Sequence, residues 1–220
     1  MLQYTNDRKN KNELWRYALI KNLIFDFGQV MIKYKPTLMA AKYIDDPEDE
    51  PLINEVLFDR LYWDRLDDGS ITDEEIIEAA RARLPERLHS VLPTIYYNWI
   101  YNLPEVEGMN ALVADLRHRY GVGLYLLSNI SEYFADNADE IRALRLFDRC
   151  FFSAKMGMTK PDPEIFLAVC RELGIEPSET LFIDDNARNI AGARSAGLEG
   201  YLFDGDAKKL GRYLEEVLTR

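Results

Sequence analysis

The sequence predicts an α/β fold in which a doubly wound, mostly parallel five-stranded sheet carries an all-helical insertion. Two observations lead to this fold class. Short apolar runs alternate with segments of helical periodicity at the start of the chain and again in its second half, and a continuous helix-like stretch interrupts that alternation. The predicted strands are 22–27, 122–127, 150–153, 181–183 and 200–203.

Helix-period segments separate these strands, and some of them have clear start and stop signals. Asp162 followed by Pro163 is a good N-cap and first-turn pair, while Gly174 and Gly197 are plausible helix ends. The alternation of strand and helix is typical of a parallel sheet with helices on both faces. The predicted helices of this part are 105–120, 132–144, 163–173, 187–196 and 207–218.

Residues 36–103 do not follow that alternation and are helix-like throughout. Thr72 and Glu75 form a capping-box pattern that opens a predicted helix at 73–84. We therefore expect an α/β core made of residues 17–35 and 104–220, an inserted helical cap at 36–103, and a polar N-terminal extension at 1–16. An insertion that follows a strand lies over the C-terminal edge of the sheet, where open α/β sheets bind ligands, so the cap is expected to act as a lid.

The overall charge limits the classes of partner. The 220 residues carry a formal net charge of −11, and such a surface repels the nucleic-acid backbone, which needs clustered Lys and Arg. A small phosphorylated substrate stays possible, because a bound cation can reverse the field inside a cleft. Nucleic acid is therefore not an expected partner, and the oligomeric state stays open.

The same composition predicts a cytoplasmic protein. No apolar run approaches the roughly 18 residues of a membrane span, and the first 16 residues lack the apolar core of a signal peptide. Cys150 and Cys170 are far apart in the sequence and lie in apolar runs, so core packing is expected for both. Two such cysteines fit a reducing compartment.

Polar residues follow four of the predicted elements at positions where they could handle a phosphoryl group. Asp26 ends the first strand, and a carboxylate at that edge can attack phosphorus. Ser128 and Asn129 end the second strand and could donate hydrogen bonds to phosphoryl oxygens. Lys160 precedes a helix N-terminus, where a positive site for an anion forms. Taken alone, the polar residues at the two strand ends are also typical of ordinary turns, and Lys160 is also typical of a solvated surface lysine.

The fourth position carries two adjacent carboxylates, Asp184 and Asp185, at the end of a strand. At a buried sheet edge they would repel each other unless a cation compensates them. Together with Asp26 they offer the hard oxygen ligands that Mg²⁺ prefers. Because the three carboxylates and Lys160 converge on one edge of the predicted sheet, the sequence predicts a magnesium site there.

The order of these segments resembles the four motifs of the haloacid dehalogenase-like (HAD) hydrolases over residues 22–197. The runs 155–166 and 182–190 are the most specific, and the opening Asp-Phe-Gly-Gln-Val with the later Asp-Asp-Asn is most similar to the branch that includes alpha-D-glucose-1-phosphate phosphatase. The resemblance implies a Rossmann-like core with a C1 helical cap, and a Mg²⁺-dependent phosphatase that acts on a small phosphorylated metabolite through an aspartyl-phosphate.

The resemblance also implies roles for individual residues. Asp26 would be the nucleophile and a Mg²⁺ ligand, and the backbone carbonyl of Gly28 would be a second ligand. Asp185 would be the main ligand of the fourth motif with Asp184 nearby, and Asn189 would order this loop. The transferring phosphoryl group would be bound by Ser128, Asn129 and Lys160.

Gly28 departs from the pattern, because HAD phosphatases usually carry an aspartate there that protonates the leaving group and then activates water. Loss of a general acid and base typically costs about 10²–10⁴ in rate. A good leaving group such as an anomeric oxygen needs that proton less, so a sugar phosphate such as glucose-1-phosphate is a candidate substrate.

Two alternatives stay open. A 2-haloacid dehalogenase shares the fold and the aspartate nucleophile, although the family's dehalogenases work without a metal. A catalytically weakened phosphate-binding protein would keep the pocket without turnover, although binding does not require Asp26. Substrate choice is expected to depend on the cap. Its aromatic side chains are candidates, although core packing is the better explanation for most of them: Tyr62, Trp63, Tyr96, Tyr97 and Trp99.

Overall fold

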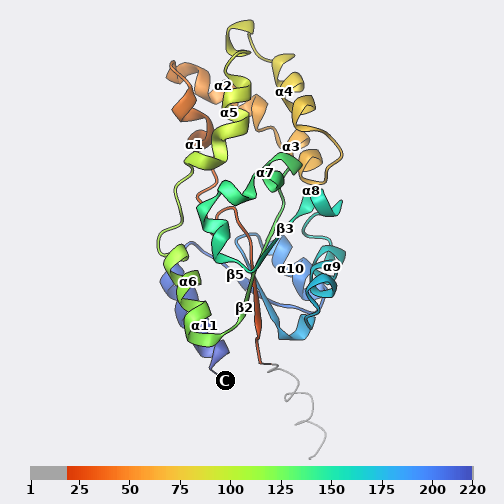
Figure 1. Ribbon diagram of the computed structural model, residues 1–220. Helices are drawn as coiled ribbons and strands as arrows, with labels where there is room; N and C mark the ends of the chain where they lie inside the picture. The colour runs from red at the N-terminus through yellow and green to blue at the C-terminus, as the bar shows by residue number, and fades with distance from the viewer. Residues whose placement is uncertain (1–18, 220) are drawn as a thin grey trace, which may run out of the picture.

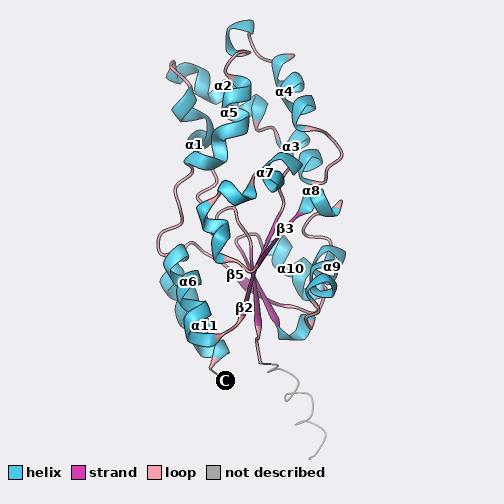
Figure 2. Ribbon diagram, viewed as in Figure 1, coloured by secondary structure: helices cyan, strands magenta, loops and turns pink. Residues whose placement is uncertain are grey.

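A parallel five-stranded sheet forms the centre of the molecule (Figures 1 and 2). The computed structural model describes residues 19–219, so the expected polar extension at 1–16 lies outside the described residues. The strand order is β3-β2-β1-β4-β5, and all neighbouring strands run parallel, which confirms the predicted fold class. The strands are β1 (Asn22–Phe25), β2 (Gly123–Ser128), β3 (Arg149–Phe152), β4 (Thr180–Asp184) and β5 (Glu199–Leu202).

The register of the central strands aligns their C-terminal ends. Phe25 at the end of β1 pairs with Leu126 of β2 on one side and with Ile183 of β4 on the other. The next residues along these strands, Asp26 and Asp184, therefore come to lie at the same level of the sheet edge. Parallel register alone thus brings two of the predicted site carboxylates together.

Helices cover both faces of the sheet and bury both faces of its strands. Helices α6 and α11 lie against one face, and α9 and α10 lie against the other (Figure 1). Leu23 and Phe25 belong to one apolar cluster while Ile24 belongs to the second, as expected for a parallel strand that is buried on both sides. The helices of this part are α6 (Met109–Tyr120), α7 (Glu132–Asp136), α8 (Ser153–Met156), α9 (Pro163–Leu173), α10 (Ala187–Ser195) and α11 (Ala207–Leu218).

The residues between 36 and 103 form a helical layer beyond the C-terminal edge of the sheet (Figure 2). We call this layer the helical cap. Thr72 and Glu75 make both hydrogen bonds of a capping box at the start of α4, as the sequence predicts. The division of the chain into domains at these boundaries stays a prediction. The cap helices are α1 (Pro36–Ala40), α2 (Glu50–Leu57), α3 (Arg60–Asp67), α4 (Asp73–Arg81) and α5 (Leu92–Asn98).

Several predicted boundaries differ from the structure. The chain leaves β1 after Phe25 because it turns sharply near Gln29, which has a positive φ of 56°. Helix α6 begins only at Met109, after Gly108 with a φ of 84°. The predicted helix 132–144 is broken after α7, where the Asn137 side chain bonds back to the carbonyl of Tyr133. Ser153 is the first residue of α8 rather than the end of β3.

The remaining boundary shifts are small, and several short turns complete the chain. Helix α4 ends at Arg81 rather than 84, and α10 ends at Ser195 rather than 196. Both cysteines are free; Cys170 is buried and Cys150 is half-buried. Within residues 19–219, no helix has both the length and the apolar character that crossing a membrane requires. Turns of 3-10 helix lie at Ala41–Tyr43, Pro47–Asp49, Glu86–Leu88, Trp99–Asn102, Ala138–Glu140, Arg142–Leu146 and Pro177–Glu179.

Candidate active site

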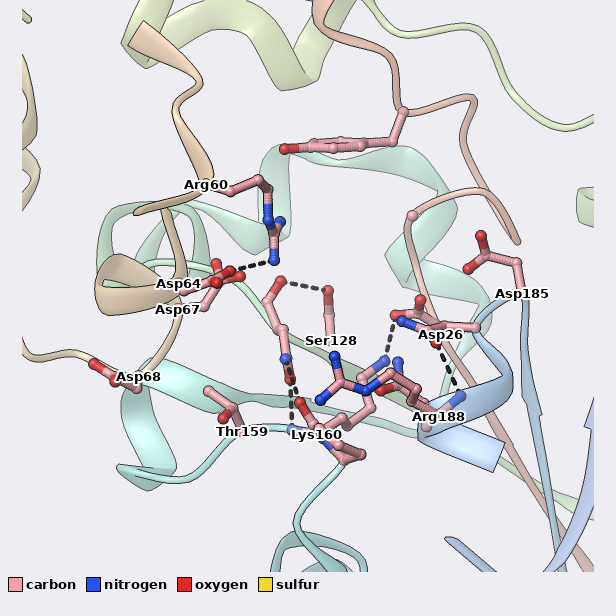
Figure 3. Close-up of a pocket in the computed structure, with 16 residues that line it drawn as sticks. Asp26, Arg60, Asp64, Asp67, Asp68, Ser128, Thr159, Lys160, Asp185 and Arg188 are labelled. Atoms are coloured by element: carbon pink, nitrogen blue, oxygen red, sulfur yellow. Dashed lines mark hydrogen bonds and ion pairs between the residues drawn. The ribbon is translucent and has the colours of Figure 1, made fainter. Parts of the chain in front are cut away.

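A buried lysine lies at the centre of the polar cluster at the sheet edge (Figure 3). The ammonium of Lys160 donates to Asp26 Oδ1 at 2.7 Å, to Asp184 Oδ2 at 3.0 Å and to the Leu127 carbonyl at 2.9 Å. Its side chain is only 2% exposed. All three of its protons are therefore directed to acceptors that end β1, β2 and β4.

The backbone of Lys160 is fixed by the side chain of Asn129. Asn129 Oδ1 accepts from the Lys160 amide at 2.9 Å, and Asn129 Nδ2 donates to the Lys160 carbonyl at 3.0 Å. This pair of bonds mimics a strand ladder and locks the lysine against the end of β2. The contact that the structure shows for the Asn129 side chain is thus with Lys160, and its expected contact with a phosphoryl group stays a prediction.

Asp184 is fully buried and its carboxylate has several donors. Besides Lys160, it accepts from the Asn186 amide at 2.7 Å and from Asn189 Nδ2 at 3.0 Å. The second bond ties Asn189 to Asp184, and the role of Asn189 in ordering this loop, which the family resemblance implies, stays a prediction. Asp185, by contrast, is exposed and lines the pocket.

Three carboxylates come close enough to share a cation. One oxygen each from Asp26, Asp184 and Asp185 lies within 4.8 Å of the other two. Among the residues that the structure describes, the Lys160 ammonium is the one cation that pairs with them, so the ionised cluster keeps an excess of negative charge that a divalent cation would balance. The donor set is made only of hard carboxylate oxygens, which suits Mg²⁺. The residues present therefore fit the expected metal.

The electrostatics of the cluster agree with this excess of negative charge. Burial, together with the neighbouring Asp184 carboxylate, raises the pKa of Asp26 to about 7 against the opposing effect of Lys160. Burial and Asp184 likewise raise the pKa of Asp185. Burial disfavours the charged form of Lys160, but the carboxylates of Asp26 and Asp184 outweigh it and raise the pKa of its ammonium. Lys160 is thus held as a cation.

Gly28 lies beside Asp26 in a loop that the core fixes in place. Bridges join Gly28 to Ile32 and Ile32 to Glu105, and the Gln29 amide donates to the Ile32 carbonyl at 2.7 Å. A Cβ atom added to Gly28 would meet only the Tyr34 side chain, at an ordinary contact distance of 3.7 Å. A Cβ atom at position 28 is therefore not excluded by lack of space.

The cluster opens into a pocket of about 470 Å³ between the core and the helical cap (Figure 3). The predicted residues Asp26, Gly28, Ser128 and Asp185 line it. The Ser128 hydroxyl is directed to this region, and its hydrogen bond to the Asn129 carbonyl is long at 3.5 Å. The further lining residues are Tyr34, Arg60, Asp64, Asp67, Asp68, Asn129, Thr159, Lys160, Pro161, Asn186, Arg188 and Asn189.

Sequence reasoning missed the residues that the cap contributes to the pocket. Arg60, Asp64 and Asp67 lie on helix α3 at spacings of four and three residues, so they share one face of the helix. That polar row in a segment with otherwise helical apolar periodicity was the signal available in the sequence. This polar row predicts that the cap lines the pocket only if the fold is already known to place α3 over the strand ends.

The aromatic residues of the cap pack together rather than line the pocket. Trp63, Tyr96 and Trp99 are buried, and Trp63 contacts both others with ring centroids 5.6–6.3 Å apart. None of the five predicted aromatic candidates is among the pocket-lining residues within 19–219. Tyr34, which packs edge-on against Trp99, is the aromatic residue that reaches the pocket.

Comparison with known proteins identifies the class to which this fold and site belong. Residues 13–197 match the model of a family described as haloacid dehalogenase-like hydrolase. The match covers well over half of the chain, so the chain belongs to this family of hydrolases.

The relatives with known names include two phosphatases. A D-ribitol-5-phosphate phosphatase of Bacteroides thetaiotaomicron is 27% identical over 192 residues, which cover 83% of this chain and 91% of that protein. A sesquiterpene phosphatase of Aspergillus oryzae is 26% identical over 184 residues, which cover 82% of this chain and 88% of that protein.

Solved structures share the fold along nearly the whole chain. A HAD family enzyme of Bacteroides thetaiotaomicron in complex with magnesium has a TM-score of 0.64 and is 26% identical, with 89% of this chain and 100% of that chain covered. A dehalogenase with an intermediate complex has the same TM-score at 21% identity, with 83% and 84% covered, which shows a shared fold alone.

Proposed function

We propose that the chain is a Mg²⁺-dependent phosphomonoester hydrolase that acts on a small phosphorylated metabolite through an aspartyl-phosphate at Asp26. The observation that carries this proposal is the Asp26 carboxylate, held at 2.7 Å by the buried Lys160 ammonium and placed beside two further carboxylates. Only a reaction that needs both a nucleophile and strong neutralisation of negative charge uses this combination fully.

The residues of the chain would share the work as follows. Asp26 attacks the phosphorus atom in line with the leaving oxygen, and the displacement transfers the phosphoryl group to its carboxylate. Lys160 and the Ser128 hydroxyl face the oxygens on which negative charge spreads. Asn129 keeps Lys160 in place through its two backbone bonds. Mg²⁺ held by Asp26, Asp185, Asp184 and the Gly28 carbonyl would neutralise phosphoryl charge.

The pocket supports a polar substrate. Its lining combines two arginines, Arg60 and Arg188, with several carboxylates and hydroxyls, which suits the hydroxyl groups of a sugar or polyol phosphate. The relative named as a D-ribitol-5-phosphate phosphatase supports the same class. Glucose-1-phosphate remains a specific candidate.

A screen of phosphorylated metabolites tests the proposal. We expect Mg²⁺-dependent release of phosphate from a subset that includes sugar or polyol phosphates, abolished by EDTA and by Asp26→Asn. The Asp26→Asn blank keeps the shape of the pocket and removes the nucleophile.

Two other results would contradict the proposal. Turnover no higher than the Asp26→Asn blank across the panel, with phosphate still bound, would mark a phosphate-binding protein. Release of halide from a 2-haloacid in the presence of EDTA would mark a dehalogenase instead.

A further inference from the structure

We propose that Asp67, contributed by the helical cap, is the general acid and base that position 28 lacks. Its carboxyl group would protonate the leaving oxygen in the first step and take the proton of the attacking water in the second. This inference rests on the phosphatase function proposed above, and it assigns to the cap a part of the chemistry that the core does not supply.

Asp67 is placed by contacts between the cap and the core. It is the last residue of helix α3, and its backbone carbonyl accepts from the buried Ser153 hydroxyl at 2.5 Å. The same hydroxyl accepts from the Ile130 amide at 2.9 Å, two residues after Ser128. A Cβ on Gly69 would lie 3.2 Å from the Ala154 carbonyl, so the turn after α3 also approaches the core closely. The end of α3 is thus tied to the phosphoryl side of the pocket.

The Asp67 carboxylate lines the pocket and has no partner that accounts for its burial. The residue is 7% exposed. Within residues 19–219 no hydrogen bond or ion pair to its carboxylate is found, whereas the neighbouring Asp64 pairs with Arg60. A buried carboxylate is costly unless it is paired or protonated. Burial without a partner among these residues therefore favours the protonated form of Asp67, which can donate a proton into the pocket.

The charges around Asp67 favour proton exchange near neutral pH. Burial raises the pKa of Asp67 to about 7. On its own helix, Asp64 reinforces this effect and Arg60 opposes it; from the core, Asp26 reinforces it and Lys160 opposes it. A group with a pKa near the working pH can both give and take a proton at useful rates.

The location of Asp67 also suits the stereochemistry of the displacement. An in-line attack by Asp26 places the leaving oxygen on the far side of the phosphorus atom. Figure 3 shows Asp67 beside Asp64 on the side of the pocket opposite Asp26, with Ser128 and Lys160 between them. A leaving oxygen on the side of the phosphorus away from Asp26 would therefore face the cap wall that carries Asp67.

The protons and bonds balance over the two steps. In the first, a bond forms between Asp26 and phosphorus, the bond from phosphorus to the leaving oxygen breaks, and the Asp67 proton converts that oxygen into an alcohol. In the second, water attacks phosphorus, its proton returns to the Asp67 carboxylate, and the bond to Asp26 breaks. Inorganic phosphate and the starting enzyme result.

Substrates with different leaving groups test the role of Asp67. An alkyl phosphate needs a proton on its leaving oxygen, whereas p-nitrophenyl phosphate releases a stable anion without one. We expect Asp67→Asn to lower kcat/KM for the alkyl phosphate about 10²–10⁴-fold. With p-nitrophenyl phosphate the variant should give a rapid burst of about one nitrophenolate per enzyme, followed by slow turnover, because the second step has lost its base.

Two further variants sharpen this test. Asp46→Asn makes the same charge change elsewhere on the cap, at an exposed carboxylate outside the pocket that accepts from the Glu48 amide, and should show neither the burst nor the leaving-group dependence. Gly28→Asp in the Asp67→Asn background should restore much of the alkyl phosphatase activity, since a Cβ atom at position 28 stays at an ordinary contact distance of 3.7 Å from Tyr34.

The wild-type enzyme gives an independent readout that does not depend on how the variant folds. The ratio of its kcat/KM for the alkyl phosphate to that for p-nitrophenyl phosphate should fall above about pH 7 as Asp67 ionises, because the ionisation of Asp26 affects both substrates alike. The same pH profile for both substrates, or an equal loss of both activities in Asp67→Asn without a burst, would overturn the role of Asp67. Neither outcome touches the proposed function, which fails instead if Asp26→Asn stays active.

Discussion

The two walls of the pocket differ in how firmly their polar groups are held. On the core side, Lys160, Asp184 and Asn129 are buried or half-buried and every one of them is bonded to residues of another element. On the cap side, Arg60 and Asp64 are exposed and pair within a single helix. The polar groups of the core side are thus fixed in one arrangement. Substitutions of the exposed residues on the cap side can alter substrate choice at little cost to stability.

The largest expected effect comes from removing the cation of the core side. Lys160→Ala leaves the carboxylates of Asp26 and Asp184 buried without a positive partner, which should lower the free energy of unfolding by about 3–5 kcal/mol. Phosphatase activity should be lost as well. Urea unfolding in the presence of EDTA measures the change in stability.

The matched control for this prediction is Lys155→Ala. Lys155 pairs with Asp136 at 2.9 Å on the surface, with 40% of its side chain exposed. Such a pair contributes about 0–1 kcal/mol. Equal losses in the free energy of unfolding for the two variants would mean that a buried ion pair at Lys160 contributes no more than an exposed one. The proposed difference between the two sides of the pocket would then be wrong.

Asp67 differs from the other polar residues of the cap side because it is buried without a partner among residues 19–219. The pH dependence of the free energy of unfolding should show this difference. Its pKa is about 7 in the folded chain, whereas an aspartate ordinarily has a pKa of 3.8, so the folded state binds the proton more tightly. The resulting stability is full below about pH 4 and is lost as the pH rises through 7. The free energy of unfolding of Asp67→Asn, compared with that of the wild type, should therefore rise by as much as about 4 kcal/mol between pH 4 and pH 8.

Unfolding free energies of both proteins in EDTA at several pH values measure this gain. Asp26 has a raised pKa in both proteins, so its effect largely cancels in the difference. A difference that does not change with pH would show that Asp67 is ionised in the folded chain. Asp67 would then not differ from the exposed, charged residues of the cap side.

The core side also depends on a close approach between two backbone segments. A Cβ on Gly192 in α10 would lie 2.1 Å from the carbonyl of Pro161, the residue after Lys160. Gly192→Ala should therefore push α10 away from the Lys160 loop, lower stability by about 1–3 kcal/mol and reduce kcat. Thermal unfolding and steady-state kinetics measure the two effects.

Gly211→Ala is the control, because it is also a helical glycine. Its Cβ would meet only the end of the Leu112 side chain at 3.3 Å, and alanine favours a helix by about 1 kcal/mol over glycine. A neutral or stabilising change is expected there. A similar change at Gly192 would show that the Lys160 loop can shift freely.

The two walls also differ in how far the sequence predicts them. Asp26, Ser128 and Asp184 each end a strand or directly follow one, and parallel register brings strand ends to one edge, so their proximity follows from the pattern. Helix α9 was predicted with its observed bounds because Asp162 caps it and Gly174 ends it. Both are local signals.

The cap side could not be predicted in the same way. Whether the polar row of Arg60, Asp64 and Asp67 faces solvent or the strand ends depends on the packing of α3 against the core, through contacts such as Ser153 with the Asp67 carbonyl. That contact joins residues 86 positions apart and leaves no local pattern. Similarly, the bond of Asn129 to the Lys160 backbone depends on two loops that meet only in the folded chain.

The smallest expected effect separates the stability of the cap from its part in the site. The Thr72 hydroxyl accepts from the Glu75 amide at 3.1 Å, and the Glu75 carboxylate accepts from the Thr72 amide at 2.7 Å. Thr72→Ala should lower stability by about 1 kcal/mol, and Thr72→Ser should retain it. Because no residue of α4 lines the pocket within 19–219, kcat/KM should not change. A fall in kcat/KM for Thr72→Ala alone would mean that the cap acts as one cooperative unit, in which loosening α4 also displaces Arg60 and Asp67 on α3.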